Sequence, residues 1–398
     1  MLDLETALNR LLESLPPPTV ERVPLTASAG RFLAEKIFSP LDLPSFDNSA
    51  MDGYAVRAAD VRGARTESPA TLKLAAKIPA GEMFAGELLA GECARIFTGA
   101  PLPRGADSVV MQEDTRAEGG VVSFLDDAAL GENVRRCGED VKRGGMLAEA
   151  GEEISPGRIA LLAATGFGTV TVSHRPNVAL IATGSELREP GQPLLPGQIY
   201  ESNRAMLTPL ITRCGGVPKV FPIVPDTLEA TKAALQNAFS SSDIVVTSGG
   251  VSVGELDFVK AAFESLGGEL HFWKVAMRPG KPFVFGRLGE KFIFGLPGNP
   301  VSSFVTFLLL VRPAILRWQG AKKISLPTHP GVLGEALSNT GDRRHFVRVR
   351  ADATGKVFSA GKQASHALCS LAGADGLLDV PPRTTLAAGS SVTVLHWI

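Results

Sequence analysis

Leucines recur at helical spacing along the first fifteen residues, at positions 4, 8, 11, 12 and 15. This spacing places them on one face of a helix, which the prolines at 16–18 should end. A second helix is predicted near residues 26–37. A third is predicted over 155–166, where Ser155 suits the N-cap and Pro156 the first turn.

Two stretches show short β-like runs between turns rich in glycine and proline. The first covers about 46–138 and includes the apolar runs at 71–78, 93–99, 107–114 and 120–125. The second is the tail, 331–398. Short runs of this kind, bounded by turn residues, are typical of small β modules.

Between 176 and about 320 the pattern changes to apolar strands that alternate with helices. Strand-like runs begin at 177, 219, 243 and 291, and helix-like runs follow at 202–216, 226–239, after 257 and from Pro300. Alternation at this length predicts βαβ units and a parallel sheet.

The predicted fold class is therefore multidomain α/β plus β, with a central α/β parallel-sheet domain at 174–321. Residues 1–45 plus 139–173 are predicted to form an N-terminal linker unit of helix and strand. An inserted small β module occupies 46–138, and a C-terminal, barrel-like β domain occupies 322–398. A chain of 398 residues is long enough for several such units.

Composition narrows the function classes. The formal net charge of −1 gives nucleic-acid binding no support. The four cysteines are far apart and form no CxxC pair, which favours reduced thiols over a disulfide framework or zinc site. No signal peptide is apparent, and the longest apolar run, 304–311, is short of the roughly 20 residues of a membrane span. We expect a soluble, cytoplasmic protein.

Three strand-to-helix turns combine glycine with polar residues: 182–186, 247–257 and 295–303. In an open α/β sheet, ligands bind beyond the carboxyl ends of the strands. Free N–H groups at helix starts and close backbone approach suit an anion there. Any one such turn could simply cap its helix, but three on one sheet favour a binding site. The central turn offers Ser248, Gly249, Gly250 and Ser252.

A basic segment lies between two of these turns and carries Lys274, Arg278 and Lys281. Pro279 and Gly280 predict a turn, so the three cations can converge on a phosphate or another oxyanion. A solvated hairpin is the alternative. Apolar neighbours on both sides argue for partial burial, and buried cations need anionic partners.

Three carboxylates, Glu186, Asp226 and Asp257, follow strands of the same predicted sheet. Hard oxygen ligands suit Mg²⁺, which takes one or two carboxylates together with substrate phosphate oxygens. Alternatively, Asp226 is only an N-cap and Asp257 only a surface residue of its helix. The chain contains no Walker loop, no GxGxxG after a strand, no GxSxG and no HExxH, which disfavours P-loop NTPases, Rossmann dehydrogenases, serine hydrolases of the elbow type and zinc hydrolases.

Six segments occur in an order and at intervals that resemble one known family. They are FDNSAMDGYAV, IFTGAPLPRGADSVVMQED, ENVRRCGEDVKRG, TSGGVSVGELD, MRPGKPFVFG and GLPGNPVSSFVTF. Together they closely resemble the molybdopterin molybdenumtransferases, which include the bacterial MoeA proteins and the gephyrin E domain. By composition alone, the first two segments would be ordinary turn material.

The resemblance implies an elongated homodimer whose active site lies between the α/β domain, of molybdopterin-binding type, and the β module of the partner subunit. The implied reaction inserts molybdate into adenylylated molybdopterin with Mg²⁺, and releases AMP and molybdenum cofactor. The implied upstream donor is a molybdopterin adenylyltransferase. The implied functional positions are Asp52, Thr98, Asp140, Glu186, Asp226, Asp257, Lys274, Arg278, Lys281, Pro297, Pro300, Arg348 and Ser370.

On this reading, the glycine-rich turn at 248–252 holds the substrate phosphates, the carboxylates hold Mg²⁺ and the basic segment receives molybdate. The sequence departs from the family pattern at Arg278, where lysine is common, and at Glu255, where aspartate is frequent. The tail around Arg348 and Ser370 matches only loosely, with Cys369 just before Ser370.

Two other functions compete with this reading. The α/β domain by itself resembles the molybdopterin adenylyltransferases, but the long N-terminal half has motifs of its own. A non-enzymatic, gephyrin-like scaffold is the other alternative. The chain lacks the Pro/Ser linker and the fused second enzyme domain expected of that role.

Overall fold

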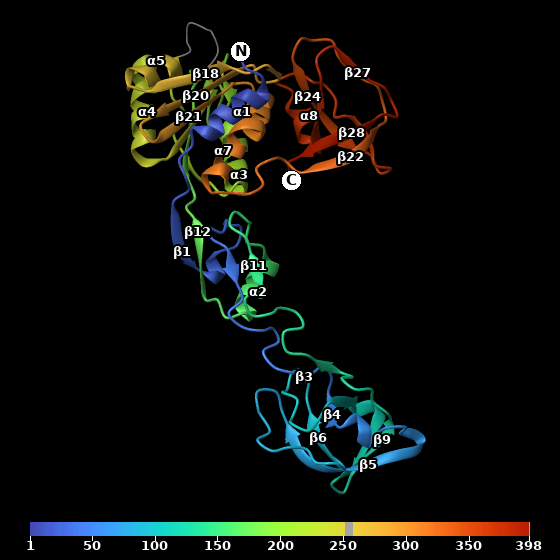
Figure 1. Cartoon of the computed structure of the whole chain (residues 1–398). Coiled ribbons are helices and arrows are strands. Elements are labelled where there is room, and N and C mark those ends of the chain that lie inside the picture. Colours follow the sequence, from blue (N-terminus) through green and yellow to red (C-terminus); the bar gives the residue numbers. More distant parts are fainter. Residues whose placement is uncertain (251–257, 398) are drawn as a thin grey trace.

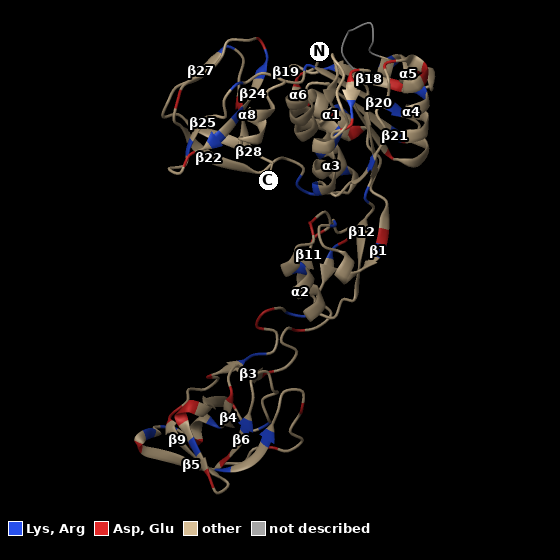
Figure 2. Ribbon diagram, turned by 180° about the vertical axis from the view of Figure 1, so that it is seen from behind, with Lys and Arg blue, Asp and Glu red and all other residues tan. Residues whose placement is uncertain are grey.

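The computed structural model describes residues 1–250 and 258–397. The chain is elongated: an α/β domain and a C-terminal barrel lie at one end, a narrow linker follows, and a β module forms the far end (Figure 1). Lysine and arginine are interspersed with aspartate and glutamate along its whole length (Figure 2). This distribution agrees with a formal net charge of −1 and shows no block of one sign.

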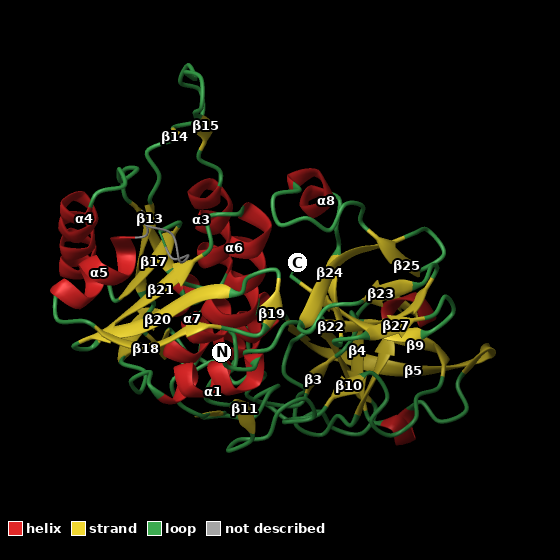
Figure 3. Ribbon diagram, turned by 90° about the horizontal axis from the view of Figure 1, so that it is seen from above, coloured by secondary structure: helices red, strands yellow, loops and turns green. Residues whose placement is uncertain are grey.

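The α/β domain is built on a six-stranded sheet in the order β16-β13-β17-β21-β20-β18. The first four strands are parallel, as predicted, and β20 runs antiparallel to both of its neighbours, β21 and β18. Their bounds are β13 (Asn177–Ala182), β16 (Val217–Val220), β17 (Ile244–Ser248), β18 (Glu269–Lys274), β20 (Pro282–Leu288) and β21 (Lys291–Leu296). A small parallel pair, β14 (Leu187–Arg188) and β15 (Ile199–Tyr200), projects beyond the strand ends (Figure 3).

Helices cover both faces of this sheet (Figure 3). On one face lie α4 (Leu228–Ser241) and α5 (Phe258–Ser265). On the other lie α1 (Leu4–Glu13), α3 (Asn203–Arg213), α6 (Pro300–Thr306) and α7 (Arg312–Trp318). The N-terminal helix is formed as predicted, and its leucines pack into the core of the α/β domain instead of joining the linker.

A single continuous helical stretch runs from α6 through a π-helical turn, Phe307–Val311, into α7. This stretch, Pro300–Trp318, is the one helix in the described residues that is long and apolar enough to cross a membrane. Of its most apolar window, 78% is buried inside the protein, so it serves as the core helix of the α/β domain.

The linker consists of two pairs of short antiparallel strands and one helix. β1 (Val20–Pro24) pairs with β12 (Thr169–Ser173), and β2 (Ile37–Phe38) pairs with β11 (Met146–Ala148). The helix α2 (Pro156–Ala164) begins as predicted, because the side chain of Ser155 accepts a hydrogen bond from the amide of Arg158.

The prediction of a helix near 26–37 is wrong. Only a 3₁₀ turn, Leu25–Ala27, forms there, and Gly30 then adopts φ +68°. Beyond it, Phe32 and Leu33 form bridges with Glu153 and Val172. Pairing with strands that come more than a hundred residues later overrides the local helical tendency.

The β module contains a six-stranded sheet in the order β7-β4-β6-β5-β9-β8. Its strands are β4 (Gly53–Val56), β5 (Arg65–Ile78), β6 (Glu92–Ile96), β7 (Ser108–Met111), β8 (Thr115–Glu118) and β9 (Val121–Asp126). A short pair, β3 (Asn48–Ser49) with β10 (Val134–Arg135), connects it to the linker.

The C-terminal domain is a closed barrel. Its strands follow the order β24-β25-β22-β28-β26, and the last strand, β26, pairs with the first, β24. Its five strands are β22 (Thr328–Leu333), β24 (Arg344–Ala351), β25 (Lys356–Ser359), β26 (Gly376–Val380) and β28 (Ser391–His396), with the pair β23 (Leu337–Asn339) and β27 (Thr384–Leu386) and the helix α8 (Leu368–Ala372) beside them. The strand β19 (Met277–Arg278), from the basic segment, pairs with β24 and joins the barrel to the α/β domain.

Candidate active site

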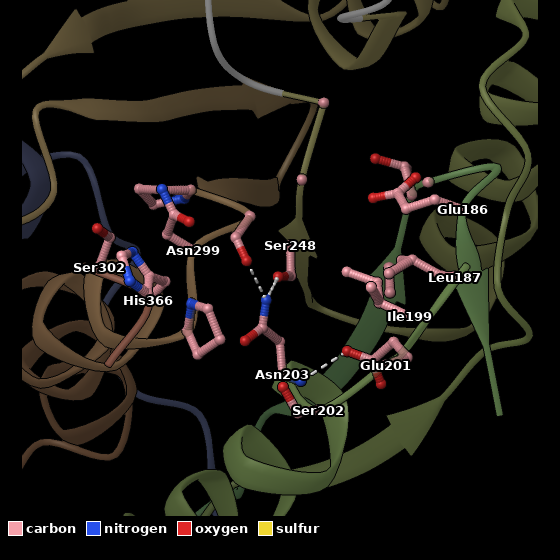
Figure 4. A pocket seen from close by; sticks show the side chains of 18 of the residues that line it. Glu186, Leu187, Ile199, Glu201, Ser202, Asn203, Ser248, Asn299, Ser302 and His366 are labelled. Atoms are coloured by element: carbon pink, nitrogen blue, oxygen red, sulfur yellow. Dashed lines mark hydrogen bonds between the residues drawn. The ribbon is translucent and has the colours of Figure 1, made fainter. Parts of the chain in front are cut away.

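A pocket of about 660 Å³ opens at the carboxyl ends of β13, β17 and β21, as the sheet topology predicts. Its lining contains residues that the sequence analysis assigned to the site and others that it did not (Figure 4). The lining includes seven of the predicted site residues: Glu186, Asp226, Ser248, Gly249, Gly250, Pro297 and Pro300. It also includes His366 and Leu368, which come from the C-terminal domain.

The glycine-rich turn after β17 requires glycine for steric reasons. Gly249 and Gly250 have φ angles of +92° and +66°. A Cβ at Gly249 would lie 2.6 Å from the carbonyl oxygen of Thr183, and one at Gly250 would lie 2.8 Å from the Thr183 hydroxyl. The two glycines therefore let this turn pack directly on the end of β13, at the rim of the pocket.

Two carboxylates line the same pocket. Glu186 is exposed after β13, and Asp226 is half-buried before α4. The N-cap of α4 is Thr227, whose side chain accepts from the amide of Ala230. The alternative reading of Asp226 as that N-cap is therefore wrong: its carboxylate accepts instead from the amide of Ser185, 2.9 Å away, in the neighbouring turn.

Asn203, which sequence reasoning treated only as part of a helix cap, connects three segments of the pocket (Figure 4). Its side-chain Nδ2 donates to Ser248 Oγ at 2.6 Å and to the carbonyl oxygen of Gly298 at 2.8 Å. Its backbone amide donates to the carboxylate of Glu201 at 2.7 Å. The ends of β17 and β21 are thereby tied to the start of α3.

Glu201 is itself fixed by a buried ion pair. Its carboxylate accepts from Nε of Arg204 at 3.0 Å, and Arg204 also donates to Glu189 at 2.8 Å. Burial by itself would lower the pKa of Arg204, but its hydrogen bonds to the carboxylates of Glu189 and Glu201 raise it overall. Both partners of the inner pair are at most 5% exposed. This network makes one wall of the pocket rigid.

Pro300 occupies the first position of α6, as predicted, next to the buried Pro297 at the pocket wall. The amide of Val301 donates to the carbonyl oxygen of Ser365, in the C-terminal domain, at 3.1 Å. This contact satisfies one of the helix-start amides that have no partner within the helix. It also brings His366 to the pocket, where it lies beside Ser302 (Figure 4).

The basic segment lies beside the pocket but contributes only Pro282 to its lining. Lys274 pairs across the sheet with Pro282 and is half-buried. Arg278 and Lys281 are exposed. Within the described part of the chain, none of the three cations has a carboxylate within 4 Å, so their charges are available to an anion.

Arg348 and Ser370 lie inside the C-terminal domain and not in the lining of the pocket. The Arg348 side chain is fully buried and donates to Ser370 Oγ and to the carbonyl oxygens of Lys362 and Ala364. These bonds shape the loop that carries His366 to the pocket.

Asp52 directly precedes β4 and Thr98 follows β6, so both belong to the β module, and Asp140 lies between β10 and β11, where the module connects to the linker. The β module is at the end of the molecule away from the α/β domain and its pocket (Figure 1). The Asp52 carboxylate accepts from both the amide and the hydroxyl of Thr98, each at 2.8 Å, and these bonds lower the pKa of Asp52. Asp140 is exposed and has no side-chain bond to either residue among those described. Within one chain, these three cannot reach the pocket.

Three positions singled out from the sequence, Ser252, Glu255 and Asp257, lie outside the described residues. Among the described residues, no group of three or more His, Cys, Asp or Glu side chains is arranged to hold a metal ion. Glu186 and Asp226, in one pocket, still fit Mg²⁺, since that ion needs only one or two protein carboxylates when phosphate oxygens complete its shell.

Three family models match consecutive stretches of the chain: the MoeA N-terminal region at 2–166, a probable molybdopterin binding domain at 179–317, and the MoeA C-terminal region at 330–397. A molybdopterin molybdenumtransferase from Haemophilus influenzae is 40% identical over 402 residues, which cover 99% of this chain and 98% of the relative. The chain belongs to the molybdopterin molybdenumtransferase family.

Further relatives agree with this assignment. A molybdopterin molybdenumtransferase 2 from Mycobacterium tuberculosis is 42% identical over 381 residues, 94% of each chain. The crystal structure of a molybdopterin biosynthesis MoeA protein from Pyrococcus horikosii superposes with a TM-score of 0.83 at 36% identity and covers 100% of this chain and 99% of that one. Full-length matches of this kind do not favour an isolated adenylyltransferase or a scaffold.

Proposed function

We propose that this chain is a transferase of molybdenum cofactor biosynthesis, which inserts molybdate into adenylylated molybdopterin and releases AMP. The observation that carries this proposal is the pocket at the carboxyl ends of the parallel strands. It combines a glycine-rich turn, a helix start and two carboxylates, in a chain that matches the family over its whole length. We place this activity in the cytoplasm, as expected of a biosynthetic enzyme with reduced cysteines.

The residues divide into three groups by charge. The amides of Gly249 and Val301 already donate to the carbonyl oxygens of Leu296 and Ser365, so the neighbouring amides of Gly250 and Ser302 are the ones that suit the substrate phosphates. Glu186 and Asp226 would hold Mg²⁺, which neutralises phosphate charge when bound. Lys274, Arg278 and Lys281, beside the pocket and without carboxylate partners among the described residues, suit the doubly charged molybdate.

We further propose that the active unit is a homodimer. The Asp52–Thr98 pair would complete the pocket of the partner subunit, since it cannot reach the pocket of its own chain (Figure 1). A hydrogen-bonded, ionised Asp52 suits a role near Mg²⁺ or a substrate hydroxyl. The expected upstream partner is the enzyme that adenylylates molybdopterin.

The test is AMP release by purified protein supplied with Mg²⁺ and adenylylated molybdopterin, with and without molybdate. We expect release to depend on molybdate and to fall about 100-fold or more in Glu186→Gln, which keeps the shape of the side chain but removes its charge. Glu229→Gln, on the exposed start of α4, is the matched control. Equal release with and without molybdate would refute the insertion reaction.

A further inference from the structure

We propose that Asn203 selects the substrate through its side-chain oxygen, which accepts a hydrogen bond from an N–H or O–H group outside the phosphates. This inference rests on the proposed function and adds a specificity-determining residue to the same pocket. Asn203 lies at the start of α3 and lines the pocket between the ends of β17 and β21 (Figure 4).

The hydrogen bonds of Asn203 determine which way its amide faces. Both hydrogens of Nδ2 are used, one by Ser248 Oγ and one by the carbonyl oxygen of Gly298. The flipped amide would bring its oxygen against the Gly298 carbonyl, and two acceptors would face each other. Oδ1 is therefore the only free hydrogen-bonding group of this side chain, and it can only accept.

Asn203 Oδ1 is buried and has no hydrogen-bond partner among the described residues. The residue is 7% exposed. A buried acceptor without a donor costs free energy comparable to a lost hydrogen bond, so structures rarely keep one without a purpose. Thr183 Oγ1 lines the same pocket, is equally buried and also has no partner among the described residues. Two such oxygens in one pocket indicate a polar ligand.

The chemistry of an acceptor restricts which part of the substrate it can contact. A phosphate at neutral pH offers oxygens that accept, so it would be repelled by Asn203 Oδ1. The contact must come from a group that carries hydrogen, and the proposed substrate has two sources: the ribose hydroxyls of its nucleotide and the ring N–H or amino groups of its pterin. Either source would present an O–H or N–H donor to Asn203 Oδ1.

Asn203 also connects the strand ends, and this structural role must be separated from the contact to the ligand. Ser248→Ala removes one of the two cross-links but leaves Oδ1 in place, whereas Asn203→Ala removes both functions. Asn203→Leu keeps the branched shape of the side chain, although with a larger volume, and removes its polar atoms; it serves if Asn203→Ala does not fold. Asn237→Ala, on the exposed face of α4, is the control for general effects of replacing an asparagine.

The experiment measures the affinity of each variant, by calorimetry with Mg²⁺, for four probes: AMP, 2′-deoxy-AMP, 3′-deoxy-AMP and an oxidised pterin monophosphate. If Asn203 contacts the ribose, removing the relevant hydroxyl weakens binding to the unmodified protein by about 10-fold or more but changes binding to Asn203→Ala by less than about threefold. If it contacts the pterin, Asn203→Ala weakens binding of the pterin probe about 10-fold or more. Removing a ribose hydroxyl then changes the affinity of the unmodified protein and of Asn203→Ala equally.

Two results would overturn the proposal: affinities for all four probes that stay within about threefold on replacing Asn203, or losses that Ser248→Ala reproduces in full. The second result would mean that Asn203 acts only by connecting the strand ends. Molybdate-dependent AMP release by the unmodified protein is measured in parallel. Its absence would contradict the proposed reaction, while the binding comparison would still decide the role of Asn203.

Discussion

One wall of the pocket is held in place by residues that hydrogen-bond to each other. Glu201 accepts hydrogen bonds from the backbone amides of Asn203 and Arg204 and from the Arg204 side chain. Glu189 contacts Arg204 from outside and remains 47% exposed. The inner ion pair is thus desolvated, while the outer one is partly screened by water.

Replacing one partner of the inner pair should therefore be costly. We expect Glu201→Gln to lower the free energy of unfolding by about 3 kcal/mol, because it leaves the buried Arg204 charge with only a half-exposed partner. Glu189→Gln is the matched control, and we expect it to cost less than about 1 kcal/mol. Urea unfolding of both variants measures the difference. Similar losses for the two would show that burial does not distinguish the pairs.

At the residue scale, the sequence predicted the pocket residues at strand ends better than those that reach the pocket from other elements. Ser248 ends a strand, and Gly249 and Glu186 follow strands, so the end of each strand was enough to place them at the pocket. Asn203 and His366 reach it from α3 and from the C-terminal domain, and nothing local marks that path. The SN pair at 202–203 was visible, but as a helix cap it looked ordinary.

Among the structural elements, the turn after β17 shows how closely backbone and function are linked. Gly249 combines a positive φ with direct contact to the end of β13. Gly267, after α5, also has a positive φ, +84°, but nothing lies within 4 Å of its missing Cβ. The two positions therefore share a left-handed backbone conformation, which would strain any residue with a Cβ, and differ in the space available to that Cβ.

This pair allows strain and steric clash to be measured separately. We expect Gly267→Ala to cost about 1 kcal/mol from its left-handed conformation alone. Gly249→Ala should cost at least about 1–2 kcal/mol more and weaken AMP binding, because its Cβ must displace Thr183. Thermal unfolding and calorimetric titration would test this. Equal stability and affinity in both variants would contradict the close packing seen here.

Element type was predictable wherever a pattern was long and regular, as in the strands and helices of 176–320. The prediction failed at 26–37, where Gly30 takes a left-handed conformation and the chain pairs with the 146–173 region instead of forming a helix. The pairing of β19 with β24 was likewise invisible, because two residues carry no periodicity. Distant partners decide such short elements, and one sequence does not reveal them.

The pairing of β19 with β24 places His345 beside two cations. Burial lowers the pKa of His345 from 6.5 to about 4, and the charges of Arg278 and Arg348 add to this. The folded pKa thus lies below the unfolded one, so the unfolded chain binds the proton more readily between these values. Stability is fully present above about pH 6.5 and is lost as the pH falls toward 4.

His345→Gln should remove this part of the acid sensitivity. We expect the loss in free energy of unfolding between pH 7 and pH 5 to be smaller in the variant by roughly 2 kcal/mol, because glutamine does not titrate. Denaturant unfolding at the two pH values measures it. The pH 7 value of each protein serves as its own reference, which separates titration from any change in packing. An unchanged pH dependence would mean that His345 takes up its proton without cost.

At the scale of the whole molecule, the elongated shape separates residues that the resemblance places in one active site. The pocket is at one end, and the Asp52–Thr98 pair is in the β module at the other (Figure 1). If the two meet, they do so between copies. The proposed dimer is therefore needed to complete each active site, and activity should depend on it.

Mixing two inactive variants gives the sharpest test of that requirement. In a mixed dimer of Asp52→Ala and Glu186→Gln chains, one shared site carries both changes and the other carries neither. Random exchange should therefore restore molybdate-dependent AMP release to about a quarter of the unmodified level. Mixing Asp226→Asn with Glu186→Gln, both changed on the α/β side, should restore none, because every site then contains one altered residue. Activity that stays absent in the first mixture, once exchange is verified, would mean that each chain works with its own residues alone.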